Sequence, residues 1–318
     1  MKNGVKDELR VLLSKYGPFF ILLAMLIILS IISPYFFTVL NLTTILIQTA
    51  VVAIIAIGQT LVIITGGIDL SVGSYLCLSA IIAGLMMTSG LPLALSLILA
   101  LVFGSFLGFI NGFIVTKMKV PPFIATLGTM GMARGTALVI TGGLPVSRLP
   151  EVLAWFGRGT ILGMPVPPII FVVTALFFSW VLISTRLGRY IYAIGSNREA
   201  TKLSGINTDK YLLIVYVIAG FLSAVAGIVL IGRLGSAHPT AGIGYELNTI
   251  AAAVIGGTSL SGGIGKISGT IIGALIMGVL NNGFTLLGVS SFYQQIAIGA
   301  VVVLAVFADV LQQGKVKQ

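Results

Sequence analysis

FFILLAMLIILSII, residues 19–32, is an unbroken apolar stretch with one hydroxyl-bearing residue, Ser30. A strand of a membrane β-barrel alternates lipid-facing apolar and lumen-facing polar residues, and this stretch does not alternate. A helix pairs its backbone N–H and C=O groups within itself, which the hydrocarbon interior of a bilayer requires. The stretch therefore predicts a membrane-spanning α-helix.

The composition extends this prediction to the whole chain. Of the 318 residues 57% are apolar and 8% are charged, and the mean hydropathy is +1.14. A soluble domain carries about 25% charged residues. The net charge of +10 does not indicate a nucleic-acid partner, because the basic residues lie between apolar runs. We predict an all-α polytopic membrane protein in contact with membrane lipid.

A spanning helix needs about 20 mostly apolar residues, and this rule predicts ten transmembrane helices. The eighth is too short to cross as an ideal helix, so we expect some spans to be short or broken. The predicted spans lie near residues 17–36, 43–64, 73–88, 92–115, 122–141, 167–185, 211–233, 247–257, 267–287 and 292–310.

The basic residues predict the orientation, because loops on the cytoplasmic side carry an excess of Lys and Arg. This layout makes 1–16 and 311–318 cytoplasmic tails around a transmembrane permease-like region, 17–310. It places an outer loop at 142–166 and an inner segment at 186–210. The outer side receives Arg148, Arg158 and Arg233, and Arg134 falls in a span. The inner side receives Lys2, Lys6, Arg10, Lys15, Lys117, Lys119, Arg186, Arg189, Arg198, Lys202, Lys210, Lys266, Lys315 and Lys317.

Two glycine- and serine-rich stretches interrupt the apolar pattern and predict a weak internal repeat. GGIDLSVG (66–73) shares the pattern GG-x-x-LS-x-G with GGTSLSGG (256–263). Repeats with broken helices are common in transporters, where the pathway lies at the repeat interface. Close packing of small residues between helices is the alternative explanation. Both stretches supply candidate pathway or helix-break residues: Gly66, Gly67, Asp69, Gly256 and Gly257.

Asp69 is the only acidic residue between Glu8 and Glu151, and the layout places it at the inner boundary. An acid just before a helix can accept bonds from the free N–H groups of the first turn and meets the positive end of the dipole. We therefore expect Asp69 to cap the span at 73–88. A direct contact with a transported solute is the second interpretation.

The sequence contains no complete motif for catalysis or nucleotide binding. SLSGGIGKIS (259–268) resembles a phosphate-binding loop, but Leu260 stands where the first glycine is needed and Ile267 where Ser or Thr is needed. The single histidine, His238, and the scattered acids predict no metal site, no cofactor and no enzymatic activity in this chain.

Uncharged amides remain inside the predicted spans. Amide groups both donate and accept hydrogen bonds, which suits a neutral polyhydroxylated solute, although hydrogen bonding between helices explains any single one. The candidate pathway residues among them are Asn111, Asn248 and Asn282. The others are Gln48, Gln59, Asn281, Gln294 and Gln295.

The inner segment carries the most specific motif. Glu199-Ala200-Thr201 followed by Gly205 keeps the spacing of the E-A-A-x-x-x-G coupling motif of ABC importer permeases, although its I-x-L-P continuation is replaced by INTDKYLL. Together with GGIDLSVGS, NGFIVTKMKVPPFIATLG, GYELNTIAAAVIGGTSLSGG and NNGF, the chain resembles permease subunits of ribose-type monosaccharide ABC importers. The resemblance covers residues 40–310.

The resemblance implies a bacterial inner-membrane subunit that pairs with a second copy, a cytoplasmic ABC ATPase and a periplasmic sugar-binding protein. It assigns ATPase coupling to Asn197, Glu199, Ala200 and Gly205, and docking of the binding protein to 142–166 and 235–246. In the short coupling helix we expect Asn197 to cap the first turn, where the dipole favours an acid such as Glu199, and Gly205 to end the helix. Ribose is the first expected cargo; xylose, galactose or autoinducer-type sugars stay open. A secondary sugar carrier and a channel or scaffold are the alternatives of other classes.

Overall fold

A computed structural model describes residues 2–316, and the side chains of residues 17–311. Within these residues, seven helices are long and apolar enough to cross a membrane, and three shorter apolar helices bring the number to ten. The prediction of an all-α polytopic membrane protein is confirmed. The ten helices are α1 (Lys2–Ile32), α2 (Val39–Ile64), α3 (Val72–Thr88), α4 (Leu93–Thr116), α5 (Pro122–Thr141), α7 (Val166–Ser184), α10 (Thr208–Leu234), α11 (Tyr245–Ile255), α12 (Ile267–Leu286) and α13 (Ser291–Val316).

Several boundaries differ from the predicted spans. The first span does not start as a separate helix at residue 17, because α1 is continuous from Lys2, and it ends at Ile32 rather than at 36. α2 starts at Val39 rather than at 43, because the Thr38 side chain accepts a bond from the backbone N–H of Asn41 and caps the helix. The eighth span is short, as predicted.

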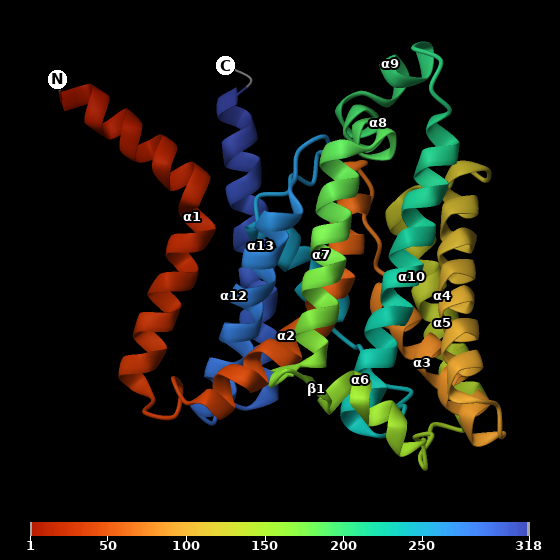
Figure 1. Ribbon diagram of the computed structural model, residues 1–318. Helices are drawn as coiled ribbons and strands as arrows, with labels where there is room; N and C mark the ends of the chain where they lie inside the picture. The colour runs from red at the N-terminus through yellow and green to blue at the C-terminus, as the bar shows by residue number, and fades with distance from the viewer. Residues whose placement is uncertain (1, 317–318) are drawn as a thin grey trace.

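The two ends of the molecule differ in their connections (Figure 1). One end carries the short helices α8 (Arg186–Ser196) and α9 (Arg198–Leu203), together with the start of α1 and the end of α13. The opposite end carries the short helix α6 (Trp155–Arg158) and a hairpin of strands β1 (Thr160–Ile161) and β2 (Met164–Pro165). We call these the α9 end and the α6 end.

α10 is the central helix of the bundle and packs against α2, α3 and α4. Glycines bring the backbones together: a side chain at Gly108 would collide with the carbonyl of Tyr216, and one at Gly104 would lie 2.8 Å from the carbonyl oxygen of Gly220. Close backbone approach increases van der Waals contact, which stabilises helix pairs in lipid where water provides no driving force. The glycine-rich sequence therefore fixes which helices form the core.

The element order repeats with opposite direction. α2, an irregular stretch at 65–71, α3, α4 and α5 are followed later by α10, an irregular stretch at 235–244, α11, α12 and α13. α2 ends beside Gly195 at the α9 end, whereas α10 ends beside Gly157 at the α6 end. The repeat is thus inverted. The two glycine- and serine-rich stretches, however, do not occupy equivalent positions in the two repeats. GGIDLSVG precedes the short helix α3, whereas GGTSLSGG follows the short helix α11.

The predicted outer loop 142–166 is ordered. It contains a 3₁₀ turn (Glu151–Ala154), α6 and the β1–β2 hairpin. The Arg158 Nε donates to the carbonyl oxygen of Arg233 at 2.6 Å. The backbones of Val146 and Ala237 exchange two hydrogen bonds of 2.8 and 2.9 Å. The stretches 142–166 and 235–246 therefore form one connected surface at the α6 end.

Candidate functional site

α9 is a short helix with defined caps at the surface of the molecule. The Asn197 side chain accepts a hydrogen bond from the backbone N–H of Ala200 at 2.9 Å, and Glu199 lies in the first turn, where the helix dipole favours an acid. Gly205 follows the helix with φ +82°, a conformation that glycine adopts without strain. The predicted local roles of Asn197 and Gly205 as cap and stop are confirmed. Ala200 is exposed, and Leu203 is 87% exposed.

α8 connects α9 to both glycine-serine stretches. A side chain at Gly195 would collide with the carbonyl oxygen of Ile64, at the end of α2, and approach the backbone N of Gly263. The Tyr192 hydroxyl donates to the carbonyl oxygen of Gly265 at 2.8 Å. α8 therefore contacts Ile64, just before the first glycine-serine stretch, and the chain at Gly263 and Gly265, at the end of the second.

Asp209 fixes the base of α9. It accepts hydrogen bonds of 2.9 Å from Lys119, between α4 and α5, and from Arg198 in α9. Both basic partners are more than a third exposed, so the two ion pairs together stabilise the arrangement by about 1 kcal/mol or less. Their function is to orient α9 relative to the neighbouring spans.

Asp69 lies inside the bundle and not at its boundary, which corrects the prediction. After the end of α2 the chain turns at Gly66, which has φ +81°, and runs back along that helix. Asp69 thereby reaches Gln59, which lies more than one helical turn before Ile64, the last residue of α2. With its amide oriented to satisfy both groups, Gln59 donates to the Asp69 carbonyl oxygen at 2.9 Å and accepts from the Asp69 N–H at 3.3 Å. Gly67 leaves room for the Tyr216 hydroxyl.

The predicted capping bond of Asp69 is wrong in its target. The carboxylate accepts from the N–H and the hydroxyl of Ser71, at 2.8 and 2.6 Å, and Ser71 is itself the N-cap residue of α3. The N–H groups of the first turn of α3 are not reached. Asp69 thus fixes the approach to the helix by a local side-chain turn.

Asn111 joins Asp69 to the rest of the core. Its amide donates to the Ser71 hydroxyl at 2.8 Å, and its oxygen accepts from the hydroxyls of Tyr75 and Thr129, at 2.9 and 2.6 Å. Asn111 is fully buried, and α3, α4 and α5 all contribute to this network. The structure therefore gives Asn111 a hydrogen-bonding role between helices.

Gly256 and Gly257 have distinct roles in the second stretch. Gly256 lies directly against the backbone of Gly269, so α11 and α12 meet there without side chains. Gly257 has φ +86° and turns the chain. The following N–H of Leu260 donates to Asp309 of α13 at 3.2 Å. This stretch connects three helices at the α9 end.

Asn282 forms a reciprocal amide pair with Asn41. The two side chains exchange hydrogen bonds of 2.7 and 3.0 Å and join α12 to the start of α2. Amide pairs of this kind stabilise the association of helices.

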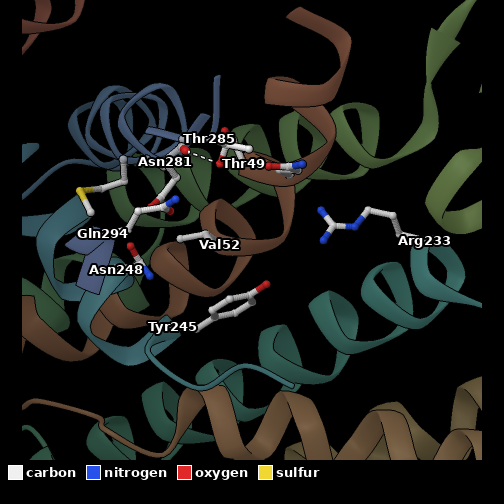
Figure 2. Close-up of a pocket in the computed structure, with 12 residues that line it drawn as sticks. Thr49, Val52, Arg233, Tyr245, Asn248, Asn281, Thr285 and Gln294 are labelled. Carbon is white, nitrogen blue, oxygen red and sulfur yellow. Dashed lines mark hydrogen bonds between the residues drawn. The ribbon is translucent and has the colours of Figure 1, made fainter. Parts of the chain in front are cut away.

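A polar pocket lies between α2, α10, α11, α12 and α13 in the half of the molecule near the α6 end (Figure 2). Its cavity volume is about 270 Å³. Figure 2 shows the side chains of Tyr245 and Arg233 pointing toward each other across the cavity. The polar residues that line it are Gln48, Thr49, Arg233, Tyr245, Asn248, Asn281, Thr285 and Gln294.

The pocket collects amides that the sequence spreads over four helices. Asn248 is the only candidate pathway residue that lines it; Gln48, Asn281 and Gln294 belong to the wider set of predicted span amides. The sequence pattern does not indicate Thr49 and Tyr245 as pocket residues, and it places Arg233 only on the outer side. No signal of spacing identifies these residues, because they come from different helices and meet only in the folded bundle.

The loop at 235–244 positions the pocket side of α11. Arg134 of α5 donates to the carbonyl oxygens of Pro239 and Ala241, at 3.0 and 2.6 Å, and thereby ties this loop to α5. Gly242 lies against Gly73 at the start of α3. α11 consequently begins inside the bundle, where Tyr245 and Asn248 reach the cavity.

Known membrane permeases are similar to this chain over most of its length. The profile of a family described as branched-chain amino acid transport system / permease component matches residues 41–306. The chain is 50% identical to the ribose import permease protein of Escherichia coli K12 over 91% of each chain, and 50% identical to that of Bacillus subtilis over 93% of each. It is 40% identical to the D-allose transport system permease protein of Escherichia coli K12, over 93% of this chain and 91% of that protein.

No solved structure matches the chain significantly. The family profile begins near the start of α2 and ends within α13. The two ribose import permeases match this chain over nearly their full length. The chain therefore belongs to the family of branched-chain amino acid transport system permease components, and within it is similar to sugar import permeases.

Proposed function

We propose that this chain is the membrane-spanning subunit of an ATP-driven importer and forms the path for a monosaccharide, ribose first. The observation that carries the proposal is α9: a capped helix that presents Ala200 and the exposed Leu203 at one end of the molecule. This helix carries the Glu199-Ala200-Thr201 and Gly205 spacing that resembles the coupling motif of ABC importer permeases, and its exposed side chains are accessible to a partner protein.

The contacts of α8 support a coupling role for α9. α8 follows α7 and precedes α9, and it packs against the end of α2 and the stretch 256–266. A displacement of α9 by a partner would reach both of these regions through packed backbone. Rigid contacts of this kind transmit movement because packed elements shift between discrete arrangements.

The charge distribution supports an inner-membrane orientation with the α9 end and both termini in the cytoplasm. Lys119, Arg198 and Lys202 are gathered at this end, whereas Arg158 and Arg233 lie together at the α6 end. Basic residues concentrate on the cytoplasmic side of membrane proteins.

Three partners follow from the proposal. A cytoplasmic ATPase contacts α9 through Glu199, Ala200 and Leu203 and performs the hydrolysis of ATP, which this chain does not. A periplasmic sugar-binding protein contacts the connected surface formed by 142–166 and 235–246. A second copy of the chain completes the membrane part, and membrane lipid surrounds it.

The choice of sugar rests on the relatives. The ribose import permeases of Escherichia coli K12 and Bacillus subtilis are 50% identical to this chain, and the D-allose permease of Escherichia coli K12 is 40% identical. Ribose is accordingly the first substrate to test, and D-allose serves as the comparison sugar.

A matched pair of leucines tests the two partner surfaces. Leu203 in α9 and Leu162 in the β1–β2 hairpin are both highly exposed and lie at opposite ends of the molecule. We expect Leu203→Asp to abolish association with the ATPase while docking of the sugar-loaded binding protein is retained. We expect Leu162→Asp to weaken docking of the binding protein and leave the ATPase bound.

The measurements are co-purification with the ATPase, binding-protein affinity, and ribose uptake into proteoliposomes that contain the candidate ATPase and binding protein. ATP turnover stimulated by ribose-loaded binding protein is the expected result for the unchanged chain. Uptake that proceeds equally well without an ATPase would contradict the importer and favour a secondary carrier.

A further inference from the structure

The polar pocket contains a buried acceptor without a partner. The Asn248 amide nitrogen donates to the carbonyl oxygen of Gly244 at 2.9 Å, while the Asn248 side-chain oxygen has no hydrogen-bond partner although the residue is nine-tenths buried. The Thr49 hydroxyl, also buried, is likewise without a partner. Burying an unpaired polar group costs about 1–3 kcal/mol, so a molecule in the pocket that bonds to these two groups gains stabilisation there.

The lining of the pocket defines the chemistry of that partner. Amides from α2, α11, α12 and α13, the hydroxyl of Tyr245 and the guanidinium of Arg233 provide both donors and acceptors. No carboxylate lines the cavity, so a cation finds no counter-charge there. A ligand that donates and accepts at several neighbouring atoms, without net charge, matches this set.

The size and place of the cavity narrow the choice further. A volume of about 270 Å³ lies just below the usual range of roughly 300–1,000 Å³ for small-molecule pockets, which suits a ligand as small as one sugar ring. The lining residues lie near the start of α2, the end of α12 and the start of α13, on the side of the connected surface 142–166 and 235–246. A solute delivered at that surface meets this cavity before it reaches the α9 end.

We propose that the pocket is a transient binding site for a neutral monosaccharide, in which the Asn248 oxygen accepts a sugar hydroxyl, Tyr245 contacts the ring from the same helix, and Arg233 contacts it from α10. This inference rests on the proposed function and adds the residues that hold the cargo. A weak site suits transport, since the cargo must also leave.

Adjacent glutamines provide a matched test. Gln294 lines the pocket, whereas Gln295 is exposed and does not. We expect Gln294→Leu and Asn248→Leu each to lower ribose uptake about 2- to 10-fold at limiting sugar, the effect of one lost hydrogen bond. Gln295→Leu should keep the uptake of the unchanged chain. ATP turnover stimulated by binding protein should persist in all three, which separates a failure of the pocket from a failure of the importer.

Thiol protection measures occupancy without transport. Cys77 is buried, so a cysteine introduced as Asn281→Cys provides a reactive group in the pocket, and Ser291→Cys provides one outside it. In the full-length chain in detergent, D-ribose should slow N-ethylmaleimide labelling of the pocket cysteine several-fold, L-glucose less, and the outside cysteine should be unaffected.

Equal labelling with and without D-ribose, together with unchanged uptake by Asn248→Leu and Gln294→Leu, would overturn the proposal. Protection by added phospholipid rather than by sugar would assign the cavity to lipid and overturn it as well. Protection by D-allose but not by D-ribose would keep the pocket as a sugar site and contradict only the choice of ribose.

Discussion

The backbone N–H of Gly263 donates a 2.8 Å hydrogen bond to the carbonyl oxygen of Ile64. Ile64 is the last residue of α2, and Gly263 belongs to the stretch between α11 and α12. The bond therefore joins the ends of two helices from opposite halves of the chain, directly beside Gly195 of α8. We infer that a movement of α8 cannot displace one of these regions without displacing the other.

Gly195 should not tolerate a side chain. A Cβ at this position would collide with the Ile64 carbonyl, so Gly195→Ala must separate α8 from α2 and should destabilise the protein by about 1–3 kcal/mol, as overpacked cores do. Thermal aggregation of the detergent-solubilised chain measures the effect. Gly17→Ala is the control, because no heavy atom lies within 4 Å of its Cβ position. Equal stability of the two variants would contradict the packing argument.

Tyr192→Phe should reduce coupling more than stability. It removes the hydroxyl that donates to Gly265 at 2.8 Å and keeps the ring. One such bond is worth about 0.5–1.5 kcal/mol, so we expect about a 2- to 10-fold fall in ribose moved per ATP hydrolysed. Tyr190→Phe is the matched control: it retains the ring that packs on Tyr211, with centroids 4.6 Å apart. A similar loss in both variants would show that the Gly265 bond is not the link.

Asp69 should accept replacement by Asn but not by Leu. The side-chain oxygen of Asn can still accept from the N–H and hydroxyl of Ser71, so Asp69→Asn should keep the fold and most of the uptake. Asp69→Leu leaves these buried donors without their acceptor and should cost about 1–3 kcal/mol of stability. Uptake and thermal stability are measured in parallel. A loss of uptake in a stable Asp69→Asn protein would instead indicate that the negative charge takes part in transport.

The Asn41–Asn282 pair should behave as a coupled unit. Each single change to Leu leaves the other amide short of a partner, whereas the double change removes both groups together. A double-mutant cycle should give a coupling free energy of about 0.6 kcal/mol, and at most about 1.7 kcal/mol, as found between helices in a bilayer. Strictly additive effects would show that the two amides stabilise the protein independently.

Local sequence predicted the local features well. The apolar run at 19–32 lies in α1, the short eighth span is α11, and Asn197 caps α9 with Gly205 after it. These features depend on residues close in the chain, whose propensities and hydrogen bonds act within one or two helical turns. The prediction for Asp69 was wrong because the chain turns back along α2 and meets Gln59 of that helix, and the pattern of residues around Asp69 does not indicate this return.

The sequence by itself determined the membrane-spanning helical class, the span positions to within several residues, and the capped short helix that ends before Gly205, because hydrophobicity and capping are properties of contiguous segments. The tertiary structure alone decided that the repeat is inverted, that Asn282 pairs with Asn41, and that Asn248 shares a cavity with Gln294 and Arg233. These relationships join residues far apart in the chain. The close packing behind them depends on glycines of α12: Gly273 lies against the backbone of Ala252 in α11, and Gly278 lies against Thr49 in α2.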